Sequence, residues 1–264
     1  MDSYKIISDV EKSHILSLSK KGQRIDGRGF NDFREISLES DYVPKAEGSA
    51  KISLGNTQII AGIKISIGTP YPDTPNSGVI TVNAELSPMA APHFEPGPPG
   101  EVSVEVARVV DRGIRHSDII DKEKLAIIPG EKVFIIFCDL YVISYDGNMF
   151  DAGELGAVKA LCTAKIPKLK VKDGEVKVID EWHPLEIEDY PVSVTIANIG
   201  GALLVDPNAN EQRVLDSRIT LALNAKNEIV SAQKGGKGSF TMDEITKSIE
   251  IAQDIAPKLR EYYK

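Results

Sequence analysis

Hydrophobic residues recur along this chain with two periods: every second residue in some segments, and every third or fourth residue in others. The runs SAKISLGN and TQIIAGIKISIG are rich in strand-forming residues and meet at Gly55 and Asn56, which tolerate positive φ, so they predict a hairpin. A third strand is predicted over Val79–Leu86. It follows the turn-rich loop YPDTPNSG and precedes SPMAAPHFEPGPPG, whose prolines exclude regular structure.

Helical spacing predicts a short helix over Asp9–Lys21 and a longer one over Glu101–Ser117, where an apolar stripe lies opposite a charged one. The next run, KVFIIFCDLYVIS, is almost wholly apolar, as expected of a central strand covered on both faces. The segment Glu154–Ala164 is rich in Ala, Gly and Leu, which predicts a closely packed helix.

The second half of the chain begins with a predicted linker, EWHPLEIEDYP, in which Trp182 is expected to be a packing anchor. Strands are predicted for VSVTIANIG, ALLVD, SRITLALN and EIVSAQK, the last two joined in a hairpin by AKN. A final helix opens at Thr241, whose spacing to Glu244 is a capping box, and Pro257 is expected to bend it. This order is too irregular for a doubly wound sheet and predicts the α+β class.

The composition is that of a globular protein, since 42% of its 264 residues are hydrophobic. No apolar run is long enough to span a membrane, and the acidic N-terminal segment is unlike a signal peptide, so we expect a cytoplasmic protein. Cys138 and Cys162 are predicted to be buried free thiols. The four histidines lack metal-ligand spacing, so neither a metal nor another cofactor is predicted. A net charge of −8 argues against a nucleic-acid partner unless basic residues gather locally.

Two segments have the character of anion sites. YDGNMFDAGELGA places a turn before a helix of small residues and could present backbone N–H groups, yet it contains no Arg or Lys. Lys234 and Lys237 lie among three glycines before the capped final helix. The alternative for this second segment is a simple strand-to-helix connection, and the sequence mildly favours that alternative.

Arg108, Arg112 and Arg115 share one face of the predicted Glu101–Ser117 helix because their spacings are four and three. One interpretation is a solvated face, in which Glu105 pairs with Arg108 and Asp111 pairs with Arg115. The other interpretation is a binding site for phosphate, whose oxygens the planar guanidinium group engages in pairs. Spacing alone favours the solvated face.

Four motifs in order resemble the ribonuclease PH family: RIDGR, EGSAKISLGNTQIIAGI, EPGPPGEVSVEVARVVDRGIR and SAQKGGKGSFTMDEI. Within it, the chain is similar to the non-catalytic ring subunits of archaeal exosomes, from about Lys21 to the end. The resemblance implies an α+β ribonuclease PH-like domain at residues 23–264, built on a ribosomal-protein-like βαβα core. Residues 1–22 would form an N-terminal helical extension.

The resemblance also implies a hexameric ring of three heterodimers with a catalytic sister subunit, RNA-binding cap subunits, and single-stranded RNA degraded from its 3′ end by phosphate. Active members carry Gly-Thr-Arg or Gly-Ser-Arg where this chain has GNMF, and an arginine where it has GPPGEVSVE. Their acidic pair falls on Asp206 and Gln212, and an amide cannot donate the proton that the reaction needs. We therefore expect no catalytic residue in this chain.

In that family, Arg108 and Arg112 match positions that contact RNA phosphates, and Arg115 is a weaker candidate because Asp111 can occupy it. The resemblance thus reverses the preference that spacing alone gave. Two other functions stay open on the sequence. One is a phosphate-dependent exoribonuclease that uses Asp206 with Asp216, with or without a metal. The other is a stand-alone RNA-binding module that needs no ring.

Overall fold

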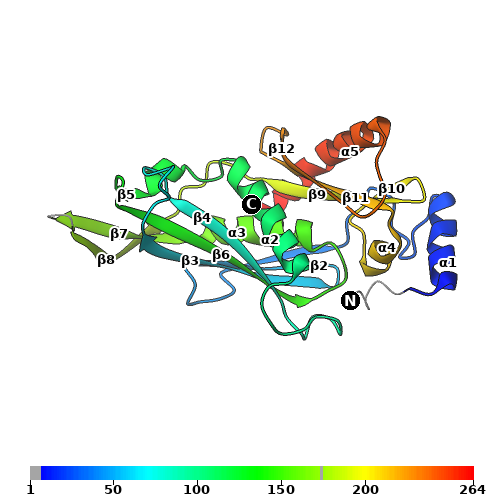
Figure 1. Ribbon diagram of the computed structural model, residues 1–264, viewed down its shortest axis with the longest axis horizontal. Coiled ribbons are helices and arrows are strands. Elements are labelled where there is room, and N and C mark those ends of the chain that lie inside the picture. The colour runs from blue at the N-terminus through cyan, green and yellow to red at the C-terminus, as the bar shows by residue number, and fades with distance from the viewer. Residues whose placement is uncertain (1–6, 173–174) are drawn as a thin grey trace.

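The computed structural model describes residues 7–172 and 175–264, and Figure 1 shows their arrangement. The α-helices are α1 (Asp9–Lys20), α2 (Glu101–His116), α3 (Met149–Thr163), α4 (Ala209–Val214) and α5 (Met242–Arg260). Two 3₁₀ helices are η2 (Lys122–Leu125) and η3 (Glu261–Tyr263). The strands are β1 (Ile36–Ser40), β2 (Gly48–Leu54), β3 (Thr57–Gly68), β4 (Val79–Leu86), β5 (Ala126–Ile128), β6 (Lys132–Ser144), β7 (Lys165–Lys172), β8 (Glu175–Pro184), β9 (Val192–Ile199), β10 (Ala202–Val205), β11 (Ser217–Leu223) and β12 (Ile229–Gly235).

The first sheet has the strand order β1-β2-β3-β6-β4, with β5 added to the end of β6. Only the β4–β6 pair is parallel. The predicted hairpin of β2 and β3 is confirmed, and Gly55 has a φ of 55° at its turn. Strand β6 is interior, as predicted, but the prediction that both its faces are covered is wrong. Its side chains alternate between buried and partly exposed because α2 and α3 pack against one face only.

The second sheet has the order β10-β9-β11-β12, all antiparallel, and includes the predicted β11–β12 hairpin. All eight residues of β9 are buried because α3 covers one face of this sheet and α5 packs on the other. Helix α3 therefore lies between the two sheets, and nearly all its side chains are buried (Figure 1). Its small residues allow this, since Gly156 lies against Ile52 of the first sheet.

The segment predicted as a linker is partly a strand. Residues 181–184 belong to β8, which pairs with β7 in a hairpin that projects from the body of the molecule (Figure 1). Trp182 is 48% exposed on this hairpin, so the prediction that it is a packing anchor is wrong. The lysines of β7 obscure the alternation of apolar and polar residues that would predict a strand. Most residues of β7 and β8 are exposed, so the sequence has no hydrophobic face to indicate a sheet here.

Both ends of the described chain are helical. Helix α1 inserts Ile15 into a small cluster with Ala197 and Ile199 of β9. Helix α5 begins with the predicted capping box of Thr241 and Glu244 and contains Pro257 in its last turns. Of the helices in residues 7–172 and 175–264, none has the length and apolar character of a membrane span. Both cysteines are free, Cys138 buried and Cys162 partly buried.

Candidate functional site

The turn that precedes α3 is built from two residues with left-handed backbone conformations. Gly147 has a φ of 84° and Asn148 a φ of 50°. A Cβ atom on Gly147 would lie 2.6 Å from the carbonyl oxygen of Pro207, so only glycine allows this approach. Asn148 is the N-cap of α3, and its side-chain oxygen accepts a hydrogen bond from the N–H of Asp151. The predicted turn before a helix is confirmed, but α3 begins at Met149, directly after the turn, and not at the predicted Glu154.

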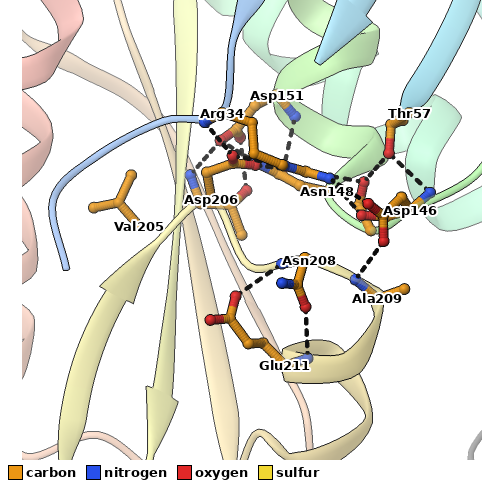
Figure 2. A network of polar contacts seen from close by, with 12 residues as sticks. Arg34, Thr57, Asp146, Asn148, Asp151, Val205, Asp206, Asn208, Ala209 and Glu211 are labelled. Atoms are coloured by element: carbon orange, nitrogen blue, oxygen red, sulfur yellow. Dashed lines mark hydrogen bonds and ion pairs between the residues drawn. The ribbon is translucent and has the colours of Figure 1, made fainter. Parts of the chain in front are cut away.

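A carboxylate of the chain itself occupies this N-terminal region. Asp206, which follows β10 and is fully buried, accepts a hydrogen bond of 2.7 Å from the side-chain amide of Asn148. Arg34 also donates to Asp206, from Nε and Nη2 at 2.9 and 2.7 Å (Figure 2). The same guanidinium group also donates to the carbonyl oxygen of Asp146 in the turn. The stretch itself contains no cation, but the fold brings Arg34 to it, and Asp206 neutralises that charge.

The RIDGR motif continues this network on the other side of Asp206. Arg28 donates to Asp206 Oδ2 at 2.9 Å and also pairs with Asp26 at 2.8 Å. Arg24 is buried and donates to both oxygens of Glu211, at 2.8 and 2.6 Å. This motif therefore forms an ion-pair network, buried at Arg24 and partly exposed at Arg28 and Asp26, that joins the segment after α1 to the β10–α4 connection and to α4.

Burial and neighbouring charges move the carboxyl pKa values in opposite directions. Burial raises the pKa of Asp206, but hydrogen bonding to the Arg34 guanidinium and its charge outweigh burial and hold it below its ordinary value. Burial in α3 raises the pKa of Asp151 to about 7 and that of Glu154 to about 8. Glu154 accepts a hydrogen bond from Ser193, while its other oxygen is buried without a partner among the described residues.

Gln212 and Asp216, the other residues that the sequence offered for catalytic positions, have partners of their own. Gln212 accepts a hydrogen bond of 2.8 Å from the Tyr145 hydroxyl. Asp216 is exposed and accepts a hydrogen bond from the N–H of Gly200. The backbones of Asp206 and Asp216 bond to Thr195 and Asn198, three residues and roughly 10 Å apart along β9. The structure therefore does not assemble the alternative acidic pair of Asp206 and Asp216.

The three predicted arginines of α2 share one face but have different surroundings. Arg108 is exposed and makes no hydrogen bond or ion pair within residues 7–172 and 175–264. Arg112 donates from Nη2 to the side-chain oxygen of Gln233 on β12 at 2.6 Å. Arg115 forms the predicted ion pair with Asp111, at 2.8 Å.

The predicted ion pair of Glu105 with Arg108 is wrong. Glu105 instead pairs at 2.6 Å with Arg218 of β11, a residue that sequence reasoning did not select. Arg34 was missed as well. Neither lies in a recognisable motif, and both reach their partners only because distant segments pack together.

The glycine-rich segment after β12 is a close-packed connection. Gly236 has a φ of 79°, and a Cβ on Gly236 or on Gly238 would lie 2.8 Å from the backbone oxygen of Asp216. Lys234 donates to the carbonyl oxygen of Gly236 at 2.7 Å. These contacts agree with the strand-to-helix interpretation. In the described part of the chain, no group of three or more His, Cys, Asp or Glu side chains is arranged to hold a metal ion.

Two family models match the chain. The first domain of the 3′ exoribonuclease (RNase PH) family matches residues 32–167, and the second domain matches residues 189–255. The chain belongs to the ribonuclease PH family. The first of these matches includes α2 and the α3 turn, and the second includes Asp206, Arg218 and α4.

Close relatives within the ribonuclease PH family are exosome subunits. The exosome complex component Rrp42 of Thermococcus onnurineus is 46% identical over 263 residues, which cover 99% of this chain and 97% of that relative. The Rrp42 component of Methanothermobacter thermautotrophicus is 48% identical over 258 residues, covering 97% and 95%. The predicted resemblance to archaeal exosome ring subunits is confirmed.

Solved structures of the ribonuclease PH family have the same fold. A chain of the Archaeoglobus fulgidus exosome with RNA bound to the active site matches with a TM-score of 0.90 and 43% identity, covering 97% of this chain and 98% of that one. A chain of an archaeal exosome core matches with a TM-score of 0.85 and 39% identity, covering 97% and 96%. The predicted α+β, ribonuclease PH-like fold with an N-terminal helix is confirmed.

Proposed function

We propose that this chain is a non-catalytic ring subunit of an archaeal cytoplasmic exosome. It structures the active site of a catalytic sister subunit and contacts RNA during phosphorolytic degradation from the 3′ end. Its ring would contain three heterodimers with that sister and would carry RNA-binding cap subunits. Residues 1–22, of which 1–6 lie outside the described residues, would extend a ribonuclease PH-like domain of residues 23–264.

One observation carries the proposal that the chain is inactive: Gln212, an amide, stands where the resemblance places the general acid of active relatives. The stretch around the α3 turn also contains no Arg or Lys, and Arg34, which the fold brings to this turn, is paired with Asp206. Gln212, at the position of the general acid, cannot donate a carboxyl proton.

The arginines of α2 support the proposed RNA contact. Arg108 is exposed and Arg112 is held by a neutral amide, so neither charge is taken up by a described carboxylate. We propose that both bind RNA phosphates and that Arg115 contributes less, because Asp111 holds it. Phosphate contacts of this kind position a strand without reading its sequence.

The proposal is tested by reconstitution. The purified chain, its catalytic sister subunit, and the two together are incubated with 5′-labelled single-stranded RNA, with and without inorganic phosphate. We expect the chain alone to leave the RNA intact, and the mixture to degrade it faster than the sister alone and only with phosphate. Native mass determination should give a hexamer. Phosphate-dependent shortening of RNA by the chain alone would overturn the proposal.

The same experiment tests the two alternative functions. An independent exoribonuclease would be active without the sister, and a stand-alone RNA-binding module would bind RNA as a monomer and leave the sister's activity unchanged. Asp206→Asn does not separate these possibilities, because Asp206 is a buried partner of Arg34 and its replacement affects folding.

A further inference from the structure

Glu105 and Arg108 lie three residues apart on α2, a spacing that brings their side chains together on one face of a helix. The Glu105 carboxylate nevertheless turns away from α2. Its Oε1 atom accepts a hydrogen bond of 2.6 Å from Nη2 of Arg218 on β11. The ion pair therefore links α2 to the second sheet, and the nearest acidic side chain on the N-terminal side of Arg108 is already occupied.

The surroundings of Arg218 hold its guanidinium group in place. The central guanidinium carbon lies 4.4 Å from the centre of the Phe150 ring, in a cation–π contact. Arg218 is directly opposite Gly235 in the β11–β12 register, and a Cβ on Gly235 would lie 1.9 Å from Nη1 of Arg218. Glycine at this position thus leaves the space that the guanidinium group fills.

Arg218 is a more favourable ion-pair partner for Glu105 than Arg108 is. Its side chain is only 12% exposed and is fixed by Phe150 and Gly235, so little conformational entropy is lost when the pair forms. Arg108 is exposed, and ion pairs between exposed helical neighbours are weak because water screens them. Glu105 therefore pairs with Arg218.

The second carboxylate near Arg108 is also taken. Asp111 lies three residues after Arg108, and its Oδ2 atom is 2.8 Å from Nη2 of Arg115. Arg112, four residues after Arg108, has a neutral partner in Gln233, and its Nε is buried without a hydrogen bond among the described residues. Arg218 and Arg115 thus hold the two carboxylates nearest to Arg108 along α2, and no described carboxylate pairs with Arg108 or Arg112.

We infer that Arg218 is a positioning residue for RNA binding: by holding Glu105, it prevents that carboxylate from neutralising Arg108. This inference rests on the proposed function, since it assigns to Arg108 the RNA contact proposed above. The ligand it concerns is a phosphodiester of single-stranded RNA. Arg218 itself need not touch the strand.

The test uses the reconstituted complex with the catalytic sister and measures its affinity for a labelled single-stranded RNA at several salt concentrations. Arg218→Gln frees Glu105 to pair with Arg108, so we expect affinity to fall about two- to fivefold. The slope of log affinity against log salt concentration should become shallower by up to about 0.7, the value for one phosphate contact. Adding Glu105→Gln to Arg218→Gln removes the competing carboxylate and restores the net charge, so affinity and salt dependence should recover.

A second variant keeps the charge of Arg218. Gly235→Ala places a methyl group where Nη1 lies and displaces the guanidinium group, so it should weaken RNA binding and be rescued by Glu105→Gln in the same way. Lys168→Gln is the control for Arg218→Gln. It also removes one cation from an ion pair, but that pair, with Glu181, lies on the β7–β8 hairpin. It should leave the affinity unchanged. Thermal unfolding of each variant verifies that the fold is retained.

The outcomes separate this inference from the proposed function. If Arg108→Gln weakens binding but Arg218→Gln and Gly235→Ala do not, the inference is wrong and the RNA contact of Arg108 stands. If Glu105→Gln fails to rescue either variant, the role of Arg218 is structural and the inference is again wrong. If Arg108→Gln leaves both affinity and salt dependence unchanged, the proposed contact and the inference fail together.

Discussion

Arg34 and Asp206 form a two-point ion pair, with Nε to Oδ2 at 2.9 Å and Nη2 to Oδ1 at 2.7 Å, between segments 172 residues apart. The two side chains are 8% and 0% exposed. The pair ties the segment before β1 to the end of β10, next to the turn that begins α3 (Figure 2). Asp206, which the family resemblance leads us to expect at the position of a catalytic aspartate, is thus an internal counter-ion in this chain.

Replacing Asp206 by Asn should destabilise the protein by about 3 to 5 kcal/mol, because Arg34 and Arg28 would remain largely buried without their shared carboxylate. Chemical denaturation at neutral pH measures this free energy of unfolding. Asp216→Asn is the control, since Asp216 is exposed, and should cost no more than about 1 kcal/mol. Equal stability of the two variants would show that the buried pair contributes nothing.

Stability should fall as pH rises between about 4.5 and 8 because of Glu154. Its pKa is raised from 4.5 to about 8 in the folded protein, so the folded state holds a proton that the unfolded state releases above its ordinary pKa. This contribution is fully present below the unfolded pKa and is lost as pH rises through the folded value. Asp151, with a pKa raised to about 7, acts in the same direction. Each group contributes a slope of at most about 1.4 kcal/mol per pH unit.

Glu154→Gln isolates this effect, because an amide has the same shape and stays neutral at every pH. The variant should lose part of the pH dependence and be more stable than the unaltered protein at pH 9. The measurement is the free energy of unfolding at pH 5 and pH 9. Glu250→Gln, at an exposed position of α5, should keep the original dependence. If the free energy of unfolding changes equally with pH in both variants, Glu154 is not the source of the pH dependence.

Among the arginines of α2, Arg108→Ala should weaken RNA binding most and Arg115→Ala least. Arg108 has no described partner, so its loss removes a whole proposed RNA contact, whereas the loss of Arg115 would at most free Asp111 to weaken that contact. The reconstituted complex is titrated with single-stranded RNA at several salt concentrations. The slope of log affinity against log salt concentration should become shallower by about 0.7 for each RNA phosphate that the variant no longer neutralises. A larger effect of Arg115→Ala than of Arg108→Ala would contradict this order.

Gly147→Ala should cost about 3 kcal/mol or more, since a methyl group would combine a left-handed backbone with a collision against the backbone of Pro207 and Asn208. Gly201→Ala is a matched control. Gly201 has a φ of 88°, and a Cβ added there would have no atom within 4 Å, so this change should cost only about 1 to 2 kcal/mol. Thermal and chemical unfolding compare the two variants. If they are equally stable, the close approach at Gly147 is not a constraint.

Elements with local signals could be predicted from the chain alone. The alternation around Gly55 predicted the β2–β3 hairpin, the helical stripe predicted α2 to within a residue, and Thr241 with Glu244 predicted the start of α5. Motif order also indicated the family, and the turn before α3 was placed correctly. The hairpin, the helices and the turn depend on residues a few positions apart, so their physical causes can be read from the sequence.

Which charges meet could be learned only from the folded chain. Arg34 and Asp206, or Glu105 and Arg218, are more than a hundred residues apart, and no spacing along the chain links them. Local spacing paired Glu105 with Arg108, because a helix brings them together. The packed and less exposed Arg218 took that carboxylate instead. Ion pairs form where burial and geometry favour them, and burial is a property of the tertiary structure.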